Sequence, residues 1–244
     1  MTFRTTLLAA AVLTLPMAAN AQPIDGLYIG AGVGANFLQS QSIKSVNGFV
    51  TNGLNLSSNV GIAGVGSLGW GFGNGVRLEL ELDYRYNSLK NINAFGAAVN
   101  VSGHEQKYGG MVNALYDFNG LSPFVVPYIG AGAGYQAIQE SVNFGGGSAT
   151  RTKGLFAYQG IAGAAFPLPT VAPGLAVTAE YRFLGTASNR NYNGIVVGND
   201  YNHSIMLGIR YAFGAPAPAP MEVKVQPAAV TRSYLVFLDR KSVV

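Results

Sequence analysis

The sequence predicts an all-β protein: an eight-stranded antiparallel up-and-down transmembrane β-barrel, with long external loops and short periplasmic turns. Three observations lead to this prediction. Apolar and polar residues alternate in eight separate segments. Hydrophobic residues make up 49% of the chain and charged residues only 11%, whereas about 25% charge is usual in soluble domains. Beyond the N-terminal segment, no apolar run is long enough for a transmembrane helix.

The segment 76–87, VRLELELDYRYN, shows the alternation most clearly. One set of alternate positions is valine, leucine and tyrosine, and the other set is charged. Because successive side chains of a strand point to opposite faces, this strand has one apolar face and one ionic face. Its length suits the roughly 9–11 residues that a tilted strand needs to cross a bilayer. In a membrane barrel the charges would face the lumen and the leucines would meet lipid; in a soluble barrel the charges would face water outside.

The other segments follow the same rule in chain order. Segment 26–37, GLYIGAGVGANF, sets apolar residues against a tyrosine and repeated glycines, which suit a narrow barrel interior. Segment 59–72 is glycine-rich with large apolar residues in phase, and a tight turn at 73–75 follows it. Segment 107–118 places Asn113 and Asp117 opposite an apolar face.

The second half of the chain repeats the pattern. Segment 124–135 contains PYIGAGAGY, an echo of the first strand. Segment 154–166 places Gln159 opposite aromatic and alanine residues. Segment 175–184 opposes Glu180 and Arg182 to an apolar face, and segment 204–213 does the same with Arg210.

Loop lengths and aromatic residues favour a membrane over water as the surroundings of the barrel. Four long polar connections alternate with three short ones, which is the asymmetry of external loops and periplasmic turns. Aromatic residues concentrate at the ends of the apolar faces, as in interfacial girdles. The alternative is a secreted lipocalin-like barrel, which would carry outward charges on most strands. Several strands here carry no charge on either face.

Residues 1–21 have the features of an export signal. Arg4 supplies a positive charge, residues 7–17 form an apolar core, and Ala19-Asn20-Ala21 is a small-residue cleavage site. We expect cleavage before Gln22, which leaves a barrel domain at 22–214. The alternative is an uncleaved anchor, for which the apolar core is short.

Nine charged residues are expected to face the barrel interior. The lumen of an eight-stranded barrel is about wide enough for side chains to fill it, and an unpaired ion there is costly. Strand directions place Asp117 level with Arg77, and Glu180 near Arg210. The charges therefore form either a packed ionic plug, or a gate in which exchange of salt-bridge partners opens a narrow channel for ions or small solutes. The predicted network is Arg77, Glu79, Glu81, Asp83, Arg85, Asp117, Glu180, Arg182 and Arg210.

We predict no catalytic, metal or cofactor site, and we do not expect an enzyme. The only histidines are His104 and His203, and two are too few for a metal site. His203 and Ser204 are adjacent, so on a strand they point to opposite faces and cannot form a dyad. Cysteine is absent, which excludes thiol chemistry. The net charge is +4, but the basic residues are scattered, so we expect no nucleic-acid partner.

The ordered set LYIGAGVGANF, YGGMVNALYDF, PYIGAGAGY and GIRYAF resembles the N-terminal barrel of OmpA-type outer-membrane proteins, over about residues 25–214. The resemblance implies a multi-pass protein of the cell outer membrane that contacts lipid and lipopolysaccharide. It also implies a structural role in envelope integrity, with surface ligands bound through the loops. Tyr211 and Phe213 are similar to the C-terminal strand signal that the outer-membrane assembly machinery reads.

The remainder of the chain resembles only the beginning of a second domain. Residues 215–232 form an Ala/Pro-rich linker, which is stiff and extended. The stretch SYLVFLD at 233–239 is similar to the first strand of the periplasmic OmpA-like domain, which binds peptidoglycan in that family. About thirty residues cannot bury an independent core. We therefore expect 233–244 to be a truncated, disordered remnant that does not bind peptidoglycan.

Overall fold

The computed structural model describes residues 22–51, 53–94, 97–100, 102–144, 147–192, 195–198 and 200–216. The predicted export signal at 1–21, the linker beyond residue 216 and the predicted remnant at 233–244 lie outside the described residues. Within the part of the chain that the structure describes, no helix has the length and apolarity needed to cross a membrane.

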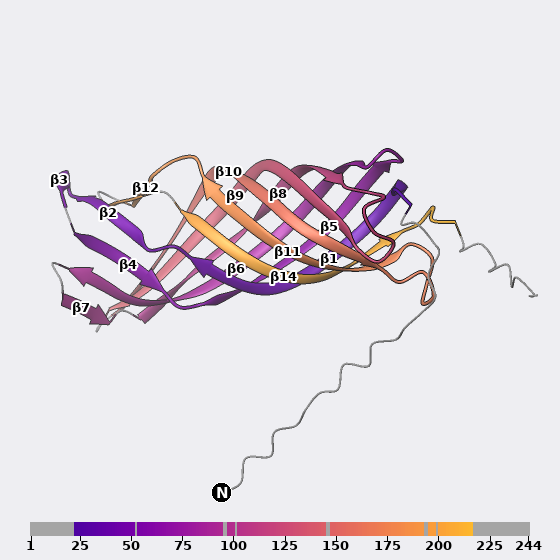
Figure 1. Cartoon of the computed structure of the whole chain (residues 1–244). Helices are drawn as coiled ribbons and strands as arrows, with labels where there is room; N and C mark the ends of the chain where they lie inside the picture. Colours follow the sequence, from indigo (N-terminus) through magenta and orange to yellow (C-terminus); the bar gives the residue numbers. More distant parts are fainter. Residues whose placement is uncertain are drawn as a thin grey trace, which may run out of the picture.

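The described chain is an antiparallel β-structure whose hydrogen-bonded strand pairs close into a ring (Figure 1). Each ring strand pairs with its neighbours along the chain, and the first pairs with the last. A closed ring leaves no unpaired edge, as a sheet in lipid requires. The ring strands are β1 (Asp25–Leu38), β5 (Gly61–Phe72), β6 (Val76–Ala94), β8 (Ser102–Asp117), β9 (Val126–Phe144), β10 (Gly147–Pro167), β11 (Leu175–Thr186) and β14 (Tyr201–Ala212).

The prediction of an all-β antiparallel fold is confirmed, and each segment predicted as a strand overlaps one ring strand. The connections differ from the prediction, because the long polar segments expected to be loops also contain strands. Outside lipid both faces of a strand can be polar, so the alternation that identifies strands disappears while the backbone pairing continues. The described residues of these connections contain six short strands: β2 (Gln41–Val46), β3 (Phe49–Val50), β4 (Leu54–Ser58), β7 (Ala97–Asn100), β12 (Arg190–Tyr192) and β13 (Ile195–Val197).

These short strands gather at one end of the barrel, at the left in Figure 1, which we call the loop end. The opposite end, which we call the turn end, carries the short connections between ring strands. The turn between β5 and β6 shows why such a connection can be tight. Gly73 and Gly75 adopt φ values of 72° and 93°, in a backbone region that glycine occupies without steric cost.

The two faces of β6 settle which side of the barrel is apolar. Leu78, Leu80 and Leu82 are 47%, 61% and 73% exposed, whereas Glu79 and Glu81 are 6% and 2% exposed. The leucines therefore point outward and the carboxylates point into the lumen. This arrangement suits lipid around the barrel, and it is the reverse of the one expected for a water-soluble carrier.

Exposed aromatic side chains mark both ends of this outward apolar face. At the turn end, the rings of Tyr116 and Phe118 meet edge to face with centroids 5.2 Å apart, and those of Tyr211 and Phe213 do so at 5.1 Å. Such amphipathic rings are typical of the boundary between lipid and water. The exposed outward aromatics are Phe37, Trp70, Phe72, Tyr84, Tyr108, Tyr116, Phe118, Tyr135, Phe156, Tyr158, Phe166, Tyr181, Tyr211 and Phe213.

Candidate functional site: a charged lumen

An ion pair in which one carboxylate oxygen accepts two hydrogen bonds lies near the turn end of the lumen. Arg77 of β6 donates from Nε and Nη2 to Oδ1 of Asp117 on the adjacent β8, at 3.0 and 2.7 Å. Both residues are 2% exposed. The second oxygen of Asp117 lies 3.9 Å from Nη1 of Arg210 on β14, on the far side of β1. One carboxylate thus lies between two guanidinium groups, in a place where burial makes an unpaired charge costly.

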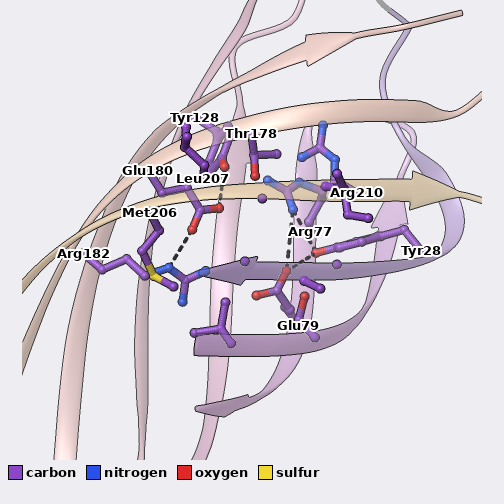
Figure 2. Close-up of a pocket in the computed structure, with 17 residues that line it drawn as sticks. Tyr28, Arg77, Glu79, Tyr128, Thr178, Glu180, Arg182, Met206, Leu207 and Arg210 are labelled. Carbon is purple, nitrogen blue, oxygen red and sulfur yellow. Dashed lines mark hydrogen bonds and ion pairs between the residues drawn. The ribbon is translucent and has the colours of Figure 1, made fainter. Parts of the chain in front are cut away.

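Tyrosine hydroxyls join this pair to the rest of the lumen (Figure 2). The hydroxyl of Tyr28 accepts from Nη1 of Arg77 at 2.9 Å and donates to Oε2 of Glu79 at 3.1 Å. Tyr128 donates in the same way to Glu180. The guanidinium of Arg77 also lies 5.2 Å from the ring centroid of each tyrosine, within reach of a cation–π interaction. Both tyrosines project from the glycine-containing faces of their strands.

Arg182 of β11 pairs with two carboxylates of different strands. Its Nε donates to Oε2 of Glu180 at 2.6 Å, and its Nη1 donates to Glu81 of β6 across the lumen. The expectation that Glu180 lies near Arg210 is wrong. In the register of β11 with β14, Glu180 is opposite Met206, and Arg210 is opposite Ala176. The stagger of the ring strands, which the sequence does not specify, therefore separates the two residues.

Amide side chains fill the middle of the lumen. Asn113 donates to Glu79 at 3.3 Å and to Glu81 at 2.9 Å, and Gln159 donates to Asn113 at 2.7 Å. Farther toward the loop end, Asp83 accepts from Arg85 and from Gln136. Nε and Nη2 of Arg85 have no hydrogen-bond partner among the described residues. Each of the nine predicted interior residues takes part in at least one of these hydrogen bonds or ion pairs.

A second ionic cluster lies at the loop end of the lumen, and the sequence did not predict it. Glu105 and Lys107 of β8 form an ion pair there. Nη1 of Arg190 lies 2.9 Å from Oε2 of Glu105, and Nζ of Lys107 lies 3.0 Å from Oδ1 of Asp200. Asn202 of β14 joins this cluster, because it accepts from Lys107 at 3.1 Å.

The positions in β8 carried a signal that could have found two of these residues. Glu105 and Lys107 share the alternation phase of Asn113 and Asp117. Lys107 already lies on the lumen-facing side of the predicted segment 107–118, and starting the strand two residues earlier places Glu105 there as well. Arg190 and Asp200 carried no such signal, because they lie in the connection between β11 and β14.

Burial raises the pKa of the Asp200 carboxyl, and the Glu105 carboxylate acts in the same direction, while Lys107 and Arg190 oppose it.

A small cavity lies among these groups near the turn end. Its volume beside Arg77, Tyr128 and Arg210 is about 30 Å³, which is room for roughly a water molecule or two. Among the described residues, acidic groups outnumber basic ones along the lumen and its loop end. The basic groups are Arg77, Arg85, Lys107, Arg182, Arg190 and Arg210, and the acidic groups are Glu79, Glu81, Asp83, Glu105, Asp117, Glu140, Glu180 and Asp200.

The histidines lie away from this network. His104 stacks on Tyr86 with centroids 5.3 Å apart, and His203 lies with Nδ1 2.7 Å from the hydroxyl of Tyr181. Ser204 points instead into the lumen and donates to Asn36 at 2.7 Å. Over the described ranges, no group of three or more histidine, cysteine, aspartate or glutamate side chains could hold a metal ion. Tyr211 and Phe213, the predicted assembly signal, lie side by side on the outer wall.

Comparison with known proteins gives one family match and several structural likenesses. Residues 5–213 match the family described as outer membrane protein beta-barrel domain. An outer membrane protein of Gluconacetobacter diazotrophicus is 40% identical over an alignment of 273 residues, covering 98% of this chain and 72% of that protein. The crystal structure of OprG from Pseudomonas aeruginosa aligns with a TM-score of 0.55 at 14% identity, over 78% of this chain and 98% of OprG. Neisserial surface protein A aligns with a TM-score of 0.49 at 20% identity, over 78% of this chain and 98% of its own.

Proposed function

Since the chain belongs to the outer membrane protein beta-barrel domain family, and so resides in the outer membrane, we propose that it is a structural barrel of the OmpA type. In this proposal the barrel supports envelope integrity and the loop end takes part in surface interactions. The observation that carries the proposal is the filling of the lumen. Ion pairs from Arg77–Asp117 to Arg190–Glu105 occupy the lumen between its two ends, and the cavity beside Arg77 is only about 30 Å³.

The proposed orientation places the loop end outside the cell and the turn end in the periplasm. Long external loops and short periplasmic turns are the usual asymmetry of outer-membrane barrels. The outward apolar face would then contact the lipid and lipopolysaccharide of the membrane. The assembly machinery would recognise the end of β14, where Tyr211 and Phe213 lie on the outer wall. The proposal includes no peptidoglycan binding, no nucleic-acid partner, no cofactor and no catalytic reaction.

A narrow channel is the second candidate. Two observations favour it: the lumen network contains polar groups without hydrogen-bond partners, such as Nε of Arg85, and acidic groups are in excess there. Exchange of partners among these groups would open a path, and the acidic excess would favour cations over anions.

Conductance of the purified, folded barrel in a planar bilayer distinguishes the two functions. Folding is checked first, because a folded barrel migrates anomalously on electrophoresis until the sample is boiled. A structural barrel gives no resolved current steps. If the lumen charges form a gate, Arg77→Ala changes the conductance, and unchanged currents in this variant would remove the gate. Regular cation-selective steps from the wild-type barrel would overturn the structural proposal and favour the channel.

A further inference from the structure

The described parts of the connection between β11 and β14, residues 187–192, 195–198 and 200, place charged side chains at the loop end of the barrel. Its strand β13 pairs with β2 of the first connection, and β2 also pairs with β4. These strands form small sheets beyond the ring (Figure 1). From this position Arg190, in β12, contacts Glu105 of β8 and Glu140 of β9. Neither β8 nor β9 is a hydrogen-bonded neighbour of β11 or β14, so these contacts span the lumen rather than an adjacent strand pair.

The same connection contributes a second charge of opposite sign. Asp200 lies 3.0 Å from Nζ of Lys107, and its other oxygen lies 3.5 Å from Nη1 of Arg190. Asn202, two residues farther on, donates to Asp200 at 2.6 Å. Arg190 and Asp200 are both 0% exposed. Charges in a surface connection are normally solvated, and burying them is favourable only while they remain paired.

The first connection takes part as well. Gln41 of β2 donates to Oε2 of Glu105 at 3.0 Å, which is also the oxygen that Arg190 contacts. Two connections that are far apart in the sequence therefore meet on one carboxylate of β8. An arrangement of this kind has a defined open alternative, because releasing Arg190 and Asp200 returns both charges to water.

We propose that the connection between β11 and β14 is an ionic latch, in which Arg190 and Asp200 hold the loop end of the lumen shut against Glu105 and Lys107. The latch acts in series with the Arg77–Asp117 pair near the turn end. It goes beyond the proposed function, because it concerns access to the lumen from the loop end whether or not ions cross the barrel. Opening would expose the middle of the lumen, including Arg85, to small solutes from that side.

A thiol on the lumen side beside the latch reports whether the loop end is closed. Leu38 is suitable: it is 9% exposed, shares the lumen-facing phase of β1, and lies opposite Asn202 in the register with β14. The chain contains no cysteine, so Leu38→Cys introduces a unique reporter. Its reaction rate with a small, water-soluble, membrane-impermeant methanethiosulfonate is measured on the folded full chain in lipid vesicles.

We expect slow labelling of Leu38→Cys alone, and labelling at least about tenfold faster when Arg190→Gln is added, because loss of a buried partner shifts the connection toward the open form. Asp200→Asn added to Leu38→Cys should also accelerate labelling, and it carries the test if the Arg190 variant does not fold. Lys90→Gln is the matched control, because Lys90 is an exposed basic residue outside the cluster. Its addition should leave the rate unchanged.

Equal labelling rates with and without the latch substitutions would overturn the latch, and so would fast labelling of Leu38→Cys alone. This readout is separate from the test of the proposed function. Conductance steps from the wild-type barrel would overturn the structural role, whereas the labelling rate concerns only the loop end. A barrel that labels faster after Arg190→Gln but still conducts no ions would support both proposals.

Discussion

The ring of Tyr28 lies directly across Gly69 of the neighbouring strand. The two residues are opposite each other in the register of β1 with β5, and a Cβ atom on Gly69 would lie 2.1 Å from Cζ of Tyr28. Tyr28 cannot move aside without loss, because it is 0% exposed and its hydroxyl bonds both Arg77 and Glu79. The absence of a side chain at position 69 therefore helps to fix the hydroxyl that bridges two charges.

Gly69→Ala should destabilise the folded barrel by about 1–3 kcal/mol, the usual cost of overpacking a filled interior. The measurement is the free energy of unfolding by urea in lipid vesicles, followed by the gel mobility of unboiled samples. Gly66→Ala is the matched control on the same strand, since no atom lies within 4 Å of its Cβ position. Equal stability of the two variants would contradict the packing role of Gly69.

The Arg77–Asp117 pair leads to a second prediction. Asp117→Asn removes the charge that faces Arg77 and Arg210, and breaking one partner of a buried pair typically costs about 3–5 kcal/mol. The double variant Arg77→Met/Asp117→Leu should recover part of this loss, because it leaves neither charge of the pair buried alone. Asp25→Asn serves as the control, as Asp25 is an exposed carboxylate at the turn end. A double variant no more stable than Asp117→Asn would argue against this pair as the source of the cost.

The alternation in β6 was predictable from sequence because its cause is local. Lipid on one side and a filled lumen on the other act on every residue between Val76 and Asn87, so the pattern itself reveals both faces. The cross-strand neighbour of Glu180 was not predictable in this way. It depends on the stagger between β11 and β14, which places Met206 rather than Arg210 opposite Glu180, so Glu180 pairs instead with Arg182 two residues along its own strand.

Two residues of the loop-end cluster, Arg190 and Asp200, could not be predicted from the sequence for a different reason. Arg190 and Asp200 enter the lumen only because the connection that carries them folds back over it, and no periodic pattern records such a path. Glu105 and Lys107 could have been found, because their alternation phase continues that of Asn113 and Asp117. The predicted strand began at residue 107 rather than at Ser102, because the polar residues that precede the lipid-facing part were interpreted as a loop, and Lys107 was left out of the predicted network although it lay inside the segment.

The outward leucines of β6 supply a test of where lipid surrounds the barrel. Leu80→Arg should destabilise the barrel by about 2–4 kcal/mol if the residue lies near the bilayer midplane, because the guanidinium would have to enter hydrocarbon. Leu80 is 61% exposed. Val50→Arg is the control, because Val50 is 78% exposed in β3 at the loop end. Unfolding free energies in vesicles measure both, and similar effects would contradict the proposed position of the membrane.

The last prediction concerns the pairing of the two connections at the loop end. Ser45 of β2 and Val196 of β13 lie opposite each other in an antiparallel pair, and such pairs have Cα atoms about 4.5–5.5 Å apart, within the range that a disulfide spans. Because the chain has no cysteine, the double variant Ser45→Cys/Val196→Cys should form one internal disulfide under mild oxidation. Its formation is measured by the loss of both free thiols in unboiled, folded protein.

Two further variants complete the test. Ser45→Cys paired with Val50→Cys tests the β2–β3 pairing in the same way. Ser45→Cys with Val171→Cys, at the turn end, should retain both thiols because the barrel separates them. Free thiols in the Ser45/Val196 variant would show that the first and last connections do not pair, and the latch would lose the sheet that supports it. Oxidation of the Ser45/Val171 variant within one folded chain would instead contradict the separation of the two ends of the barrel.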